Sequence, residues 1–254
     1  MINIMKFPLL VFLLSIVTLW LAVRIGNYFR EKLRRPLEAE EREDFNVVQA
    51  AAMTLLGLLI GFTFSMAVSR YDQRKNYEEA EANAIGTEYV RADLLPDEDA
   101  AKVRELLRHY LNQRVLFYTN HGAEQLRQID TQTSQIQYQM WSVVQANAKL
   151  HPTPIAALAI SGMNDVLNSQ GYTQAAWWNR IPTAAWILLA AIAVGCNLLI
   201  GYGAHQKSTL LFMVLPLAVS LSFFLIADID SPRGGVIRVR PENLISLSRS
   251  MLPN

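Results

Sequence analysis

The sequence contains a single cysteine, Cys196, among its 254 residues, so an intrachain disulfide is excluded. The four histidines are scattered along the chain, with no i,i+4 pair and no cysteine nearby. They are His109, His121, His151 and His205. Because zinc sites need closely spaced His and Cys ligands, we expect no metal site and no cofactor.

Strong net charge and catalytic motifs are also missing. The formal net charge is +1, and the basic residues form no stripe of the kind that binds nucleic acid. No Ser-His-Asp grouping, phosphate-binding glycine loop or nucleophile motif is present. The sequence therefore favours neither a nucleic-acid-binding protein nor an enzyme.

Charged residues are absent from four apolar runs, at 7–23, 47–69, 182–204 and 208–227. The last three are as long as the roughly 20 residues that cross a bilayer as a helix, and the first is near the lower limit. The first run is followed by "LWLAVRIG", which has no small-residue cleavage pattern, so we expect an uncleaved span rather than a signal peptide. The sequence predicts four transmembrane helices, with the first at about 7–25.

The region between the two pairs of apolar runs is polar and helical in pattern. Helices are predicted after Pro96, over about 123–150, and over about 155–177, with "HPTP" at 151–154 separating the last two. No strand-like alternation appears. We therefore predict an all-α membrane protein. Its segments are a first helix pair at 1–69, a helical domain at 70–181, a second helix pair at 182–227 and a tail at 228–254.

The second apolar run continues into this polar region without a break. The stretch "GLLIGFTFSMAVSRYDQRKNYEEAEANAIG", from Gly57 to Gly86, holds no proline. One helix is therefore expected to pass from lipid into water, with Arg70, Arg74 and Lys75 at the border.

An even number of spans puts both termini and the helical domain on one side of the membrane. The loop from Arg24 to Asn46 and the opposite side carry similar numbers of membrane-proximal basic residues. Because the positive-inside rule counts mainly Lys and Arg, charge leaves the orientation open.

Three segments resemble the bestrophin-like membrane proteins of bacteria and, more distantly, the bestrophin channels. They are "GFTFSMAVSRYDQRKNYEEAEANAIGTEYVRADLLP", "NRIPTAAWILL" and "LIADIDSPRGGVIRV", about a quarter of the chain. The resemblance implies a homopentamer in the bacterial inner membrane that conducts inorganic ions, with both termini and the helical domain in the cytoplasm.

The resemblance also implies a narrow apolar neck lined by the second span. Counted from the shared "GF", its positions are Thr54, Leu58 and Phe62, which lie on one helix face at i, i+4 and i+8. Such a neck would control conduction by dewetting. Ordinary packing against neighbouring helices is the alternative for the same three residues.

Further candidate residues lie on the same helix. Gly57 and Gly61 form a GxxxG pattern, which lets helices approach closely. A second group could set the potential of a vestibule, with snorkelling to lipid or helix-surface pairing as the alternative. This electrostatic group comprises Arg70, Arg74, Lys75 and Glu78.

Asp228 and Asp230 follow the fourth span, where carboxylates can mark an ion site. They could equally pair with Arg233 or cap the turn before Pro232. The eukaryotic bestrophins carry a dense acidic calcium-binding cluster here, and "ADIDSPRGG" has only these two carboxylates, so calcium gating is not expected.

The sequence therefore favours an oligomeric ion channel. The alternative is a non-conducting scaffold or sensor whose cytoplasmic helices bind a partner. GxxxG contacts serve dimers as readily as pentamers, so the sequence does not fix the subunit number.

Overall fold

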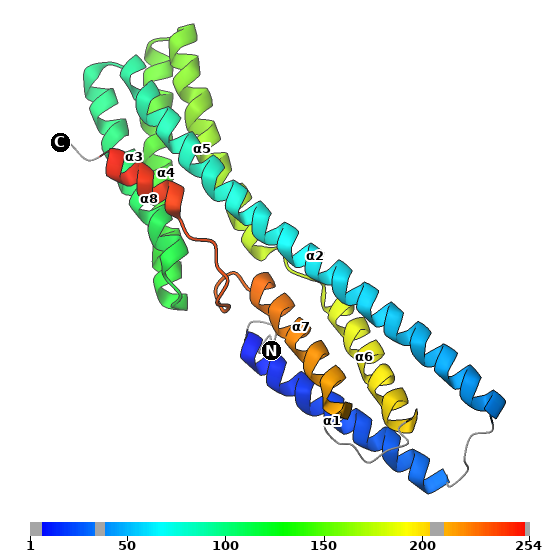
Figure 1. Ribbon diagram of the computed structural model, residues 1–254. Coiled ribbons are helices and arrows are strands. Elements are labelled where there is room, and N and C mark those ends of the chain that lie inside the picture. The colour runs from blue at the N-terminus through cyan, green and yellow to red at the C-terminus, as the bar shows by residue number, and fades with distance from the viewer. Residues whose placement is uncertain (1–6, 34–38, 204–210, 252–254) are drawn as a thin grey trace. The chain divides into compact units, whose positions relative to one another are not determined.

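The computed structural model describes residues 7–33, 39–203 and 211–251, and within these residues every regular element is helical. The chain forms two compact units. Unit 1 comprises Met1–Tyr71 and Arg180–Arg238, and unit 2 comprises Asp72–Asn179 and Val239–Asn254. Helix α2, Ala39–Arg91, is continuous through the boundary, as its lack of proline predicts (Figure 1).

Unit 1 holds α1 (Pro8–Leu33), the first part of α2, α6 (Thr183–Gly203), the short 3-10 turn η3 (Leu211–Met213) and α7 (Val214–Asp230). Helix α1 packs against both α6 and α7 (Figure 1). The core of unit 1 is formed by apolar side chains from all four α-helices, including Leu19, Leu56, Leu189 and Ile226.

Three described stretches are long and apolar enough to cross a membrane: Pro8–Lys32, Glu40–Leu94 and Pro154–Gly203. They contain three of the four predicted spans. The fourth corresponds to α7, which is apolar but only 17 residues long. Residues 204–210, at the start of that predicted span, lie outside the described residues. The fourth span therefore stays a prediction.

Unit 2 is built from the second part of α2, the turn η2 (Ala92–Leu94), α3 (Asp97–Thr119), α4 (Ala123–Leu150), α5 (Pro154–Trp178) and α8 (Glu242–Ser250). Helices α3, α4 and α5 lie side by side in chain order (Figure 1). At one end of their core, the ring of Trp177 packs edge-on against Phe117 and Tyr118, with centroids 4.9 and 5.3 Å away.

Local sequence explains where these helices begin. Asp97, Glu98 and Asp99 occupy the first turn of α3, where carboxylates favour the helix dipole. Thr153 caps α5, because its hydroxyl accepts a 3.1 Å hydrogen bond from the N–H of Ala156. Pro154 follows as the first helical residue, where its missing N–H is tolerated. The segment "HPTP" thus ends one helix and starts the next.

Candidate functional site: helix α2 and the carboxylates at the end of α7

The apolar half of α2 exposes one face and buries the other. Leu58 is 54 % exposed and Phe62 63 %, and Thr54 is exposed on the same face. The Thr54 hydroxyl donates a 2.9 Å hydrogen bond to the carbonyl of Ala50, so its polarity is satisfied within the helix. Leu56, 2 % exposed, belongs to the core of unit 1. The three predicted neck residues therefore share a face that the chain itself leaves uncovered.

The predicted packing glycines lie on exposed positions as well. A Cβ added at Gly57 or Gly61 would meet nothing within 4 Å. Within the described part of unit 1, the backbones of two helices approach closely at Gly26 and Gly201 instead. A Cβ at Gly26 of α1 would collide with the backbone of α6 at Leu198, and one at Gly201 of α6 with the backbone of α1 at Val23. Small residues inside apolar spans are the signal that could have found this pair.

The electrostatic group follows the apolar half of α2. Some of its side chains are exposed to solvent and others are buried. Lys75 is exposed. Arg70 is partly buried in unit 1, with its Nη1 3.6 Å from the Asp230 carboxylate. Arg74 is 1 % exposed, and its Nε donates a 3.3 Å hydrogen bond to the carbonyl of Ala176. Helical spacing turns Arg74 toward the interior of unit 2 and its neighbour Lys75 outward.

Glu78 is also buried, at 1 % exposure. One carboxylate oxygen accepts a 3.0 Å hydrogen bond from the N–H of Leu244, and the other a 2.6 Å bond from the amide of Asn243. Glu78 therefore holds the start of α8 on α2. Of the predicted group, two residues serve contacts inside unit 2.

A buried ion pair that sequence reasoning missed joins α2 to α3. The guanidinium of Arg114 bonds the carboxylate of Glu81, and both side chains are fully buried. The hydroxyl of Thr173 on α5 donates a 3.0 Å bond to the same carboxylate. Burial is the largest influence on the pKa of Arg114 and lowers it, but the charge and hydrogen bond of Glu81, together with Tyr110 and Tyr118, raise that pKa overall. Arg114 thus stays ionised, and its contact with Glu81 and Thr173 ties three helices together.

The two carboxylates in the last turn of α7 bind backbone groups. The oxygens of Asp228 accept hydrogen bonds from the N–H groups of Val236 and Ile237, at 2.7 and 2.8 Å. Both oxygens of Asp230 accept from the N–H of Ile181 at 3.2 Å. Within the described residues no three His, Cys, Asp or Glu side chains gather as potential metal ligands. Asp228 thus anchors the chain that follows α7, and Asp230 anchors the segment that precedes α6.

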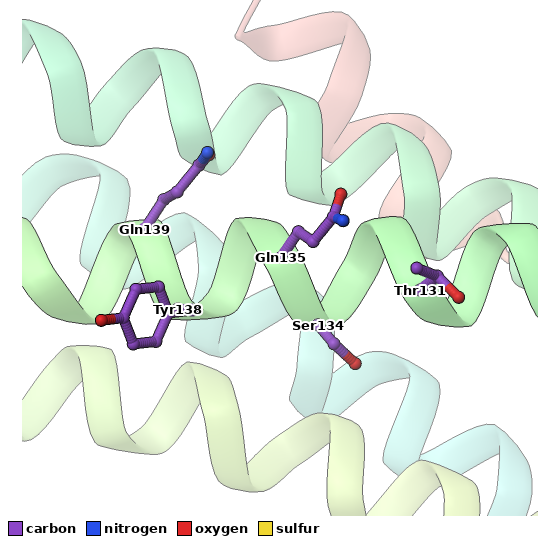
Figure 2. A pocket seen from close by; sticks show the side chains of 5 residues that line it. All are labelled: Thr131, Ser134, Gln135, Tyr138 and Gln139. Atoms are coloured by element: carbon purple, nitrogen blue, oxygen red, sulfur yellow. The ribbon is translucent and has the colours of Figure 1, made fainter.

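Hollows also lie among the described residues. An apolar groove in unit 1, about 740 Å³ in volume, lies between α1, α2 and α6. A polar hollow in unit 2 is lined by side chains from α4 alone, Thr131, Ser134, Gln135, Tyr138 and Gln139. Figure 2 shows Gln135 and Gln139 on one side of this helix and Ser134 and Tyr138 on the other. Because neither lining carries an ionised group, neither hollow offers acid–base chemistry or a strong ion site.

This arrangement of helices is similar to that of known proteins. The family model described as Bestrophin-like domain matches residues 17–244. A crystal structure of a bacterial bestrophin homologue from Klebsiella pneumoniae is 15 % identical in sequence, with a TM-score of 0.64 over 96 % of this chain and 97 % of that one. A single-residue variant of that homologue is 14 % identical, with a TM-score of 0.63 and the same two coverages.

A further crystal structure, of a membrane protein carrying one substitution, is 13 % identical, with a TM-score of 0.65 over 94 % of this chain and 97 % of that one. No curated protein sequence matches this chain. At these identities the structural likeness shows the fold, and the fold is that of the bacterial bestrophin homologues.

Proposed function

The chain belongs to the bestrophin-like family, and we propose that it forms a homopentameric ion channel whose narrow neck is lined by α2. Bestrophins are ion channels as a family. The observation that carries the proposal for this chain is the uncovered apolar face of α2. In the most apolar 18-residue window of that helix, only 17 % of the residues are buried within the chain. Lipid or other copies of the chain must cover the remainder.

The neck would consist of Thr54, Leu58 and Phe62, repeated around the symmetry axis. Leu58 and Phe62 offer no group that replaces the hydration shell of an ion. A ring of such side chains therefore blocks ion passage when its diameter is small, because water leaves the constriction. Thr54 adds little polarity, since its hydroxyl already bonds the helix backbone.

Gly57 and Gly61 would receive a neighbouring copy. Both are open in the single chain, and a residue without a side chain lets another helix approach closely. This contact would place the second span of one subunit beside that of the next, as a ring around a pore requires.

We propose four spans, formed by α1, α2, α6 and the segment ending in α7, in the bacterial inner membrane. The termini and unit 2 would be cytoplasmic, following the bestrophins. At the cytoplasmic exit of the neck, the exposed Lys75 is the member of the electrostatic group best placed to attract anions. Asp228 and Asp230 would anchor the chain rather than bind calcium.

The subunit number of the purified protein tests this proposal. Native mass spectrometry in detergent should give five copies. A monomer or dimer that persists in lipid would remove the central pore and favour a non-conducting scaffold or sensor. Replacing Gly57 with Leu should lower the subunit number. The same replacement at Gly195 on α6, which is equally open in the single chain, should leave the subunit number unchanged.

A further inference from the structure

Glu88 stands apart from the other buried charges on α2. Its side chain lies in unit 2 with 0 % exposure, and neither carboxylate oxygen has a hydrogen-bond partner among the described residues. Glu78 and Glu81, about three and two turns away on the same helix, both bind donors on other elements. Because buried polar groups are nearly always paired, the state of the Glu88 carboxyl needs a specific explanation.

The Glu88 carboxyl occupies space that a missing side chain leaves on α5. A Cβ added at Gly162 would collide with the Glu88 carboxyl and with the guanidinium of Arg91. Further along the same two helices, the rings of Tyr77 and Tyr172 stack with centroids 5.9 Å apart. Glu88 thus lies within the contact between α2 and α5.

Two charged groups act on Glu88, one from each helix. Arg91 lies one turn further along α2, and Asp165 lies on α5. In the adjoining turn η2, Asp93 is paired with Arg104 of α3. Burial is the largest influence and raises the pKa of Glu88 to about 8, while Arg91 lowers it and Asp165 raises it. The carboxyl is therefore neutral at pH 7, which explains how it can be buried without a hydrogen-bond partner among the described residues.

We propose that Glu88 is a proton-binding site that makes the packing of α5 on α2 depend on pH. The protonated carboxyl fits against Gly162 without a buried charge. When the contact opens, the carboxyl meets water and releases its proton to the solvent. This inference does not depend on ion conduction.

The sign of the effect follows from linkage. Between pH 4.5 and about 8 the packed form holds a proton that the opened form, with an ordinary carboxyl pKa of 4.5, has lost. Opening is then favoured about tenfold for each pH unit. Above pH 8 both forms are ionised and the dependence disappears. The contact is tightest in acid and weakens up to about pH 8.

Amide hydrogen exchange of the full-length protein, followed by mass spectrometry from pH 6 to 9.5, tests this. After correction for the intrinsic exchange rate, protection of the α5 segment around Gly162 should fall about tenfold per unit and level off near pH 8. Glu88→Gln should show no such slope. Glu79→Gln, which changes an exposed carboxylate on the same helix, should keep it.

Asp165→Asn gives a second test that leaves Glu88 in place, for the case in which Glu88→Gln does not fold. Removing the negative charge of Asp165 should lower the pH at which the protection of α5 levels off. The proposal would be overturned if protection of α5 in the parent protein did not fall with pH, or if it still fell in Glu88→Gln. It would also be overturned if Asp165→Asn left the pH at which protection levels off unchanged.

Discussion

The carboxylate of Glu78, in the second half of α2, accepts a hydrogen bond from the backbone N–H of Leu244 in the first turn of α8, 166 residues further along the chain. Pro241, which precedes α8, has no side-chain group to cap the helix. Glu78 supplies the missing acceptor, and its negative charge suits the positive end of the helix dipole. Glu78 lies on the part of α2 that continues beyond the second predicted span, and it thereby fixes the C-terminal helix α8.

Replacing Glu78 with Ala should release α8. The N–H of Leu244 and the amide of Asn243 would lose their acceptor, at about 1–3 kcal/mol of stability. Hydrogen exchange should show residues 242–250 losing protection while α4 keeps its own. Glu79→Ala, at the exposed neighbouring position, is the control. Unchanged protection of α8 in Glu78→Ala would show that the bond does not hold the helix.

Replacing Arg114 with Met should destabilise unit 2 strongly. It leaves the charge of Glu81 buried without its main partner, and breaking a buried pair in this way costs about 3–5 kcal/mol. Thermal unfolding of the purified protein measures the loss. The double variant Glu81→Leu with Arg114→Met should be more stable than Arg114→Met alone, because no uncompensated charge remains. A double variant that is less stable would contradict this account.

Replacing Gly201 with Ala should weaken the contact between α6 and α1. The new methyl group would collide with the backbone carbonyl of Val23, and such overpacking costs typically about 1–3 kcal/mol. Gly195→Ala is the matched control, because a Cβ there meets nothing within 4 Å on the same helix. The melting temperatures of the two variants should differ clearly, and equal values would refute the close approach.

Calcium should not stabilise the protein. The oxygens of Asp228 are already bonded to the N–H groups of Val236 and Ile237, so a cation would have to displace them. The melting temperature should be the same in millimolar calcium and in a chelator. A rise with calcium concentration would indicate a bound ion, because a ligand of the folded state stabilises it. Asp228→Ala should lower the melting temperature in both conditions.

The helices could largely be predicted from the sequence. The lack of proline between Gly57 and Gly86 predicted that α2 is continuous, and "HPTP" marked the end of α4 and the start of α5. The membership of the bestrophin-like family was also evident, because the segments that carry it are local in sequence.

The contacts of the charged residues could not be predicted in the same way. Arg74 and Glu78 were interpreted as a surface pair or a vestibule group, since charges on a helix usually face solvent. Both are 1 % exposed. The partners of Glu78 lie more than 160 residues away, and no periodicity within α2 reveals which polar residues another helix will cover. The residue types around Asp228 likewise gave no indication that backbone N–H groups would bind its carboxylate.

Ion flux into liposomes tests the central claim, that the uncovered face of α2 lines a pore. Liposomes with the parent protein should pass more ions than empty ones, and Leu58→Ala or Phe62→Ala should raise the flux further by widening the neck. Leu56→Ala, which removes a core side chain on the opposite face, should lower stability without widening the neck. Flux equal to that of empty liposomes for the parent and for both neck variants would contradict the account.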